Sequence, residues 1–142
     1  MADTTHKGYA TIATALSTGL NSLANNTASA ASSNIDNTTA LELYADFELV
    51  LGTQTARTAG AVVQVWFAVS LDGTNFADVS ISSAEYAGSF SLPLTTAAVR
   101  AVIRDVPIPP GLFQVFIYNA STQALNASGN TLKYRTHSIK TV

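Results

Sequence analysis

Residues 41–51 read LELYADFELVL, and this stretch decides the fold. Apolar side chains recur at every second position, and the positions between them are mostly acidic or aromatic. Because successive side chains of a strand point to opposite faces, this period of two predicts a half-buried β-strand with one acidic face. The apolar set is Leu41, Leu43, Ala45, Phe47, Leu49 and Leu51, and the alternate set is Glu42, Tyr44, Asp46, Glu48 and Val50.

Further strands are predicted on the C-terminal side of this stretch. Residues 62–71 alternate in the same way, and Asp72-Gly73 then predicts a turn into a return strand at 75–79. Turn-forming residues separate the short segments, and no amphipathic helix is expected after residue 40. The sequence therefore predicts an all-β fold, a single jelly-roll-like antiparallel β-sandwich. The other candidate strands are residues 90–94, 98–104, 112–119 and 131–141.

The N-terminal side has a different composition. Residues 1–38 are dominated by alanine, serine, threonine and asparagine, and large apolar residues are sparse there. Two interpretations stay open: a mobile arm followed by a weakly patterned first strand, or an arm that becomes ordered only against a neighbouring chain. The predicted division is a weakly structured arm at residues 1–20 and a β-sandwich domain at residues 21–142.

The composition narrows the classes of function. Of the 142 residues, 47% are hydrophobic and only 11% are charged, against roughly 25% charged in a typical domain. The formal charge of −2 argues against a nucleic-acid binder that works through a basic surface. The absence of cysteine excludes thiol catalysis and thiolate metal sites. No membrane-spanning segment or signal peptide is apparent, so synthesis in the cytoplasm without processing is expected.

Candidates for catalysis are few. His137 lies between basic residues with no carboxylate assigned to orient it, and we expect a surface histidine. Glu42, Asp46 and Glu48 are expected on a solvated or partner-facing strand surface. The acids of residues 72–78 are expected to form a turn, because their spacing differs from that of a calcium loop. The sequence therefore predicts no enzymatic activity, no cofactor and no metal site.

The outward strand faces carry the most informative feature. Aromatic side chains are expected to point outward on a weakly charged surface, which favours an interface, although a covering layer within the same chain would also account for them. Basic residues cluster in the last third of the sequence, whereas the middle of the sequence is acidic. This asymmetry fits docking between copies of the chain or onto a partner, and it also fits charge pairing within one molecule. The candidate interface residues are Tyr9, Leu16, Leu20, Tyr44, Trp66, Phe116, Tyr118, Lys133 and Arg135.

Three parts of the sequence are distinctive: SNIDNTT at 33–39 running into LYADFELVL at 43–51, SLDGTNFAD at 70–78, and PPGLF at 109–113. These segments resemble those of small virion proteins of tailed bacteriophages. The resemblance covers roughly residues 20–140. It implies a jelly-roll-like capsid decoration, or cement, protein on the capsid surface, which binds the major capsid protein as a homotrimer and has no catalytic residues. The charge and the lack of a membrane-spanning segment predict no nucleic-acid partner and no membrane partner.

A second hypothesis comes from the same motifs. A Ser-x-Asp-Gly-x-Asn-aromatic sequence also recurs in sugar-binding sandwiches, and residues 70–76 match it. In a carbohydrate-binding module of a phage tail or head fibre, Trp66, Tyr44 or Tyr118 would stack on a sugar ring. Asp72 and Asn75 would hydrogen-bond to its hydroxyl groups.

Overall fold

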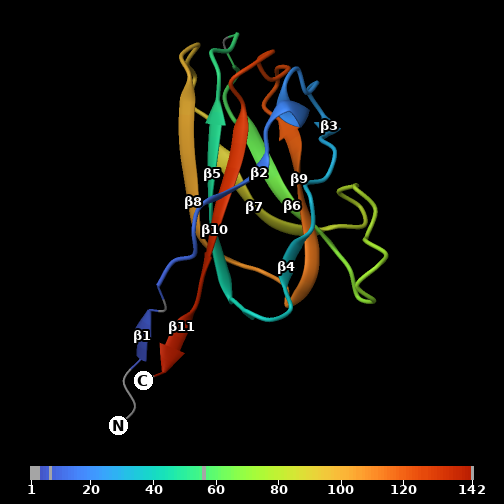
Figure 1. Ribbon diagram of the computed structural model, residues 1–142. Helices are drawn as coiled ribbons and strands as arrows, with labels where there is room; N and C mark the ends of the chain where they lie inside the picture. Colours follow the sequence, from blue (N-terminus) through green and yellow to red (C-terminus); the bar gives the residue numbers. More distant parts are fainter. Residues whose placement is uncertain (1–3, 7, 56, 142) are drawn as a thin grey trace.

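The computed structural model describes residues 4–6, 8–55 and 57–141, and it is an all-β protein (Figure 1). Two antiparallel sheets pack face to face as a sandwich, as predicted. Among the described residues, no helix has the length and apolar character needed to cross a membrane. The elements are β1 (Thr4–His6), β2 (Ala13–Leu16), the 3-10 helix η1 (Thr18–Leu20), β3 (Thr27–Ala28), β4 (Ile35–Asn37), β5 (Tyr44–Leu51), β6 (Val62–Val69), β7 (Glu85–Ser91), β8 (Val99–Pro107), β9 (Gly111–Ala120), β10 (Thr131–His137) and β11 (Ile139–Thr141).

The strand order explains the shape of the sandwich. One sheet has the order β2-β10-β5-β8, and the other has the order β3-β9-β6-β7, with β4 also paired to β9. Because β3 and β4 follow the same edge of β9, they act as one interrupted strand. With β3 and β4 counted as one strand, each sheet has four strand positions, and the chain crosses repeatedly between the two sheets. The resulting strand order is that of a jelly roll.

The core lies between the two sheets. Ala45, Phe47, Leu49 and Leu51 of β5 are each at most 1% exposed, which confirms the inward face predicted from residues 41–51. The prediction is wrong for Leu41 and Leu43, which are more than half exposed. The strand begins only at Tyr44, after Leu41 adopts a positive φ, so the alternation of the first residues does not continue onto the sheet.

The loop after β6 also differs from the prediction. Residues 75–79 were expected to form a return strand, but β7 begins only at Glu85. Asp72 instead closes a tight turn, because its carboxylate accepts hydrogen bonds from the backbone N–H groups of Thr74 and Asn75 at 2.8 and 2.7 Å. The turn predicted at Asp72-Gly73 is therefore present, and a long loop precedes the return strand.

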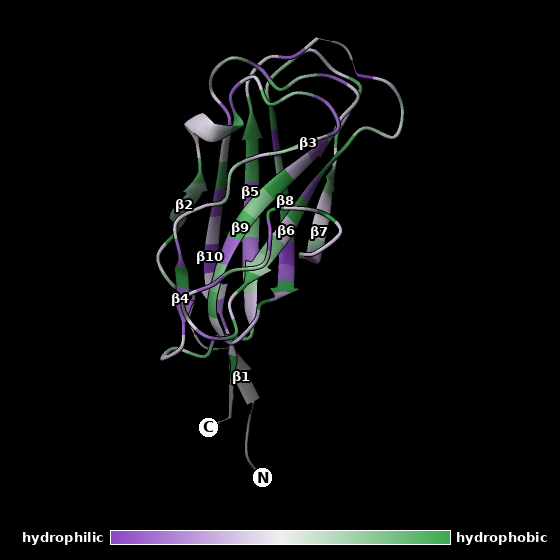
Figure 2. Cartoon of the chain, turned by 90° about the vertical axis from the view of Figure 1, so that its right-hand side faces the viewer, coloured by the Kyte–Doolittle hydropathy of each residue, from purple (hydrophilic) through white to green (hydrophobic). Residues whose placement is uncertain are grey.

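The N-terminal segment enters the sandwich earlier than predicted. β2 pairs with β10 at the sheet edge, and Leu16 and Leu20 belong to the buried core cluster. The predicted arm boundary at residue 20 is therefore wrong, since residues 13–20 are part of the folded domain. Residues 1–3 and 7 of that arm lie outside the described residues. β1 pairs with β11 in a two-stranded ribbon that extends beyond the sandwich, and both termini lie at this end (Figures 1 and 2).

The alanine- and serine-rich run forms the interrupted edge strand. Where β3 ends, Ser29 and Ser32 continue the ladder, because their N–H groups donate to the carbonyls of Ile117 and Val115, each at 2.8 Å. Their hydroxyl oxygens accept the N–H groups of the same two residues at 3.1 and 3.0 Å. A small hydroxyl side chain thus replaces a backbone acceptor where the chain leaves strand geometry. Figure 2 shows this segment beside the largely apolar β9.

Candidate functional site

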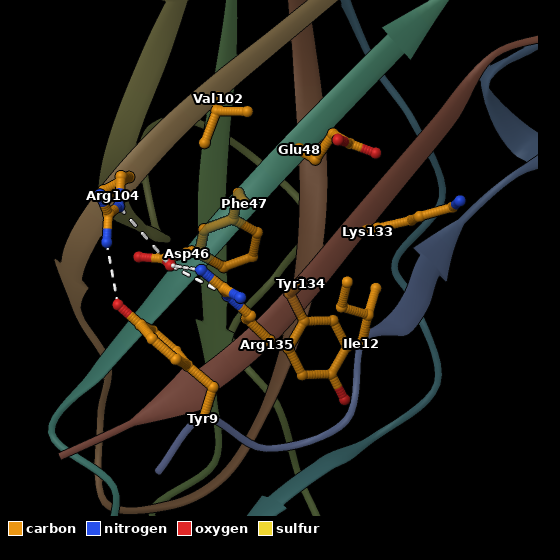
Figure 3. A pocket seen from close by; sticks show the side chains of 10 residues that line it. All are labelled: Tyr9, Ile12, Asp46, Phe47, Glu48, Val102, Arg104, Lys133, Tyr134 and Arg135. Carbon is orange, nitrogen blue, oxygen red and sulfur yellow. Dashed lines mark hydrogen bonds and ion pairs between the residues drawn. The ribbon is translucent and has the colours of Figure 1, made fainter. Parts of the chain in front are cut away.

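A groove of about 470 Å³ lies on the outer face of the β2-β10-β5-β8 sheet (Figure 3). β5, β8 and β10 form its floor, and the segment before β2 forms one wall. Its rim is mixed, since Ile12 and Val102 are exposed apolar residues beside cationic and acidic ones. The lining residues are Tyr9, Ile12, Asp46, Phe47, Glu48, Val102, Arg104, Lys133, Tyr134 and Arg135.

Asp46 is the centre of the polar contacts on this face. Its side chain is 6% exposed, and Arg135 donates to Oδ2 through Nε and Nη2 at 3.1 and 3.0 Å. The N–H of Asp105 donates to Oδ1 at 3.1 Å, and Arg104 Nε lies 3.8 Å from Oδ2. Burial raises the pKa of Asp46, but the Asp105 N–H and the Arg135 guanidinium, foremost among several neighbours, lower it more. The net pKa is below its usual value, so this buried carboxylate is held ionised.

A β-bulge places Asp105 beside Asp46. In the pairing of β5 with β8, Ala45 faces Val106 and Phe47 faces Ile103, so two residues of β8 oppose Asp46 alone. Asp105 takes a positive φ of 55° at this point. A bulge changes the direction of the side chains beside it. Both Asp46 and Asp105 consequently reach the same neighbour on β10.

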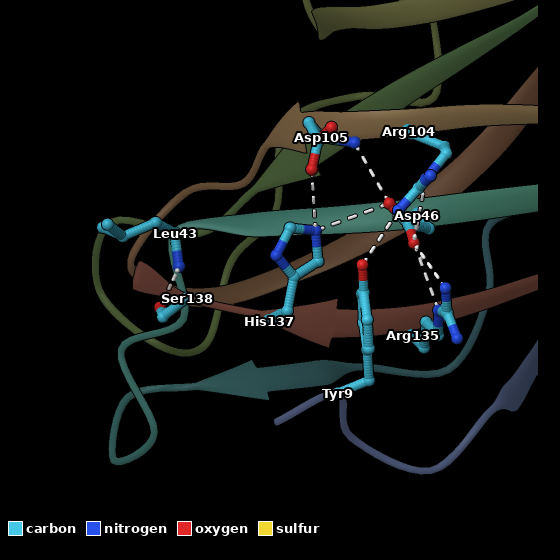
Figure 4. A network of polar contacts seen from close by, with 8 residues as sticks. All are labelled: Tyr9, Leu43, Asp46, Arg104, Asp105, Arg135, His137 and Ser138. Carbon is cyan, nitrogen blue, oxygen red and sulfur yellow. Dashed lines mark hydrogen bonds and ion pairs between the residues drawn. The ribbon is translucent and has the colours of Figure 1, made fainter. Parts of the chain in front are cut away.

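That neighbour is His137, and its environment corrects the prediction of a surface histidine. The side chain is 3% exposed and lies beside Asp46 and Asp105 (Figure 4), and two aromatic rings contact it. Tyr44 stacks on it with centroids 5.6 Å apart, and Tyr9 meets it edge-on at 5.0 Å. Nε2 lies 3.4 Å from Asp46 Oδ1 and 3.2 Å from Asp105 Oδ1. No carboxylate near His137 in the sequence was assigned to orient it, but the fold places two carboxylates beside it.

Tyr9 fastens the N-terminal segment onto this network. The Arg135 guanidinium lies 3.7 Å from the centre of its ring, and Arg104 donates to its hydroxyl at 2.9 Å. The adjacent N–H of Ala10 donates to the carbonyl of Thr136 at 2.9 Å. Such a cation–π contact is worth about 0.5–1 kcal/mol at an exposed site. Tyr9 remains 45% exposed, so it is at once an anchor and part of the surface.

The candidate interface residues fall into three groups. Tyr9, Tyr44, Lys133 and Arg135 share the outer face of the β2-β10-β5-β8 sheet, with Tyr44 beside His137 rather than in the groove lining. Leu16 and Leu20 were expected at contacts between chains, but they are buried in the core of this chain. The third group lies on the outer face of the other sheet and comprises Trp66, Phe116 and Tyr118.

On that second face, the outward orientation holds but full exposure does not. Phe116 is 0% exposed although it lies outside the cluster between the sheets, so this chain itself covers it. The covering layer considered from the sequence is therefore present at Phe116. Trp66 and Tyr118 are half-buried, and Trp66 meets Tyr86 edge-on with centroids 5.2 Å apart. Tyr86 itself is 54% exposed.

Sequence reasoning missed several residues of the site. Alternation placed Asp46, Arg135 and His137 on outward faces, but nothing in the sequence paired β10 with β5, where Arg135 faces Asp46. Arg104 and Asp105 depend on a bulge, which has no clear sequence signature here. Ile12 and Val102 carried no sequence feature that marked them as residues of a site, because each was one apolar residue among others in its segment or strand. The sequence therefore showed the residue types of the site, but it did not predict that the fold brings them together.

The groove offers binding chemistry in the part of the chain that the structure describes. Its lining contains carboxylates, guanidinium groups, a lysine and phenol rings, and it contains no serine, threonine or cysteine. Comparison with known proteins adds no assignment: no protein-family model matches the chain, and no curated protein matches it. The geometry of the surface therefore carries the functional argument.

Proposed function

We propose that the chain is a non-enzymatic structural protein of a tailed-bacteriophage virion. In this proposal it is a decoration, or cement, protein, which stabilises the head by binding the lattice of the major capsid protein as a homotrimer. It is made in the host cytoplasm and ends on the capsid surface. The β-sandwich supports the proposal at the level of fold, and the composition of the surface supports it at the level of contacts.

The observation that carries the proposal is the number of large apolar side chains in water. Among the described residues of a chain with only 11% charged residues, Leu71 is fully exposed and Leu94 is 64% exposed. Single exposed apolar residues are common on free surfaces, but their combination with so few charged residues favours a surface that other proteins cover. The other such residues are Tyr9, Ile12, Leu41, Leu43, Val79, Ile81, Tyr86, Val102 and Ile139.

The distribution of these residues fits a protein that other proteins contact on several sides. Most lie on the groove rim, on the long loop after β6, or near the ribbon of β1 and β11, whereas Tyr86 lies on β7 and Leu94 lies between β7 and β8, so they do not form one patch. A cement protein contacts other copies of itself and also the capsid shell, so it needs several contact areas. Many weak contacts on a repetitive lattice add up through avidity.

The test combines assembly state with binding to heads. We expect sedimentation to show a trimer, and we expect the protein to co-sediment with heads purified without it from the virus that carries the gene. Val102→Asp and Leu71→Asp introduce charge at exposed positions and should weaken binding or trimer formation at least tenfold. Thr53→Asp adds the same charge at another exposed position and is the matched control. A strict monomer that does not bind heads would refute the proposal.

One observation favours a second candidate, a carbohydrate-binding module. Trp66 and the exposed Tyr86 form an aromatic pair on an outer sheet face, which is suited to stacking on a sugar. The arrangement predicted from the sequence is different, since Tyr44 lies on the other sheet and Asp72 is engaged by its own turn. A glycan array probed with the protein and with Trp66→Ala separates the candidates, and binding lost in the variant would favour the sugar module.

A further inference from the structure

We propose that His137, Asp46 and Asp105 bind one divalent transition-metal cation, and that Zn²⁺ fits the three donors best. The proposal goes beyond the virion function and does not depend on it. The three donor atoms are His137 Nε2, Asp46 Oδ1 and Asp105 Oδ1, and all lie within 4.8 Å of one another (Figure 4). They come from β10, β5 and the bulge in β8.

The first argument is the buried nitrogen of His137. Its side chain is 3% exposed, and Nε2 has no hydrogen-bond partner although two carboxylate oxygens are 3.2 and 3.4 Å away. A proton on Nε2 would lie along a fixed direction in the ring plane, and neither oxygen is placed to accept it. Leaving a buried polar atom without a partner costs about 1–3 kcal/mol. A cation between nitrogen and oxygens would satisfy all three.

The second argument is the spacing of the donors. Zinc is held at about 2.0–2.2 Å by histidine nitrogen and carboxylate oxygen, usually in tetrahedral geometry. Two donors at such distances are about 3.3–3.6 Å apart in a tetrahedron. The separation of 3.4 Å from Nε2 to Asp46 Oδ1 lies in this range, and the separation of 3.2 Å to Asp105 Oδ1 lies just below it. In the same geometry each oxygen lies to the side of the ring nitrogen's axis, which agrees with the missing hydrogen bonds.

The third argument is that the ligands are already oriented by other contacts. Arg135 holds Oδ2 of Asp46, which leaves Oδ1 directed at His137. The rings of Tyr44 and Tyr9 fix the imidazole plane. Contacts of this kind, one layer beyond the ligands, set the orientation of metal ligands in proteins. Asp105 is 63% exposed, so the cation has a path from solvent and room for water as its fourth ligand.

The test uses Zn²⁺ alone with the full chain after chelator treatment and dialysis. Calorimetry should give one Zn²⁺ per chain, and Co²⁺ in its place should show the visible absorption of a four-coordinate site. Asp105→Asn should weaken Zn²⁺ binding at least tenfold. Asparagine tolerates the positive φ at this exposed position, so this variant keeps the fold. Asp78→Asn removes the same charge from another exposed loop and should bind Zn²⁺ like the unmodified chain.

The outcomes are separable from those of the virion proposal. His137→Gln should abolish the Co²⁺ spectrum, and the Asp105 variant keeps the test decisive if that chain does not fold. Absence of Zn²⁺ binding overturns the site, and so does binding that Asp105→Asn leaves unchanged. Neither result bears on whether the protein forms trimers or binds heads.

Discussion

Asn119 shows how single polar residues hold the loops of this sandwich. It is fully buried, and its Nδ2 donates to the carbonyls of Leu23, Ala24 and Gln123 at 2.9, 3.1 and 2.9 Å. Its Oδ1 accepts the N–H of Ser121 at 3.0 Å. One side chain thus joins the end of β9 to the segment before β3. Asn37 and Asn130 make similar buried contacts, so part of the asparagine content is structural.

We predict that Asn119→Ala destabilises the protein by about 2–4 kcal/mol. The substitution leaves buried backbone groups without partners, and each such loss costs about 1–3 kcal/mol. Urea denaturation followed by tryptophan fluorescence should show a lower midpoint with an unchanged slope. Asn34→Ala removes one exposed hydrogen bond to Gln114 and should change the stability by less than about 0.5 kcal/mol. Equal effects of the two substitutions would contradict this account.

Asp72 gives a prediction about pH. Hydrogen bonds from Asn75, through its N–H and its side chain, and from the N–H of Thr74 and the Ser70 hydroxyl lower the pKa of Asp72 well below its usual value. Because the folded-state pKa is below the unfolded one, the stabilisation is complete above about pH 4 and disappears as the pH falls through the folded-state value. The stability advantage of the unmodified chain over Asp72→Asn should therefore shrink between pH 5 and pH 2. A constant difference over this range would show that ionisation does not matter.

At the scale of elements, residue pattern predicts some strands well and others poorly. β5 and β9 have long alternating stretches whose inward side chains are buried, so their existence and inner faces could be predicted. β3 and β4 are two and three residues long and contain no apolar alternation. Their place on β9 depends on serine hydroxyls that complete the ladder, which is a tertiary property. A composition of small polar residues therefore gave no pattern from which these two strands could be predicted.

We predict that Ser29→Ala and Ser32→Ala weaken the edge of β9. Each substitution removes the hydroxyl acceptor of a buried N–H, at Ile117 or Val115, and should cost about 1–2 kcal/mol. Hydrogen exchange measured by NMR should be faster at those two amides than in the unmodified chain. Ser33→Ala, at an exposed position of the same run, is the control and should leave both amides protected. Unchanged exchange in the two variants would rule out the structural role of these hydroxyls.

At the scale of the molecule, the sequence predicted the sandwich but not the convergence on its outer face. Strand periodicity depends on near neighbours, and it therefore identified the all-β class and most inner faces. The site at Asp46 needs the register of β10 on β5 and the bulge of β8, which join residues 89 and 59 positions apart. Contacts at such separations depend on topology. The misplacement of Leu16 and Leu20 has the same origin, because their burial requires β2 to pair with β10.

The same topology predicts how far the N-terminus can be shortened. A chain without residues 1–10 loses β1 and Tyr9 but keeps β2 and both leucines, so it should fold cooperatively, with a groove that lacks one wall. A chain without residues 1–20 also loses an edge strand and two buried leucines. Truncating one buried leucine to alanine already costs about 2–5 kcal/mol, against a total stability of about 5–15 kcal/mol.

Circular dichroism and thermal melting of the two shortened chains check this prediction. We expect a sharp transition for the chain that begins at residue 11 and a loss of cooperative folding for the chain that begins at residue 21. Leu16→Ala and Leu20→Ala in the full-length chain separate the loss of the core side chains from the loss of the strand. If the chain that begins at residue 21 melts like the full-length protein, then β2 and η1 are dispensable and the first twenty residues form an arm after all. Because only the first of these chains should stay folded, it is the one in which a role of Tyr9 in the proposed trimer and in the proposed binding to heads can be measured.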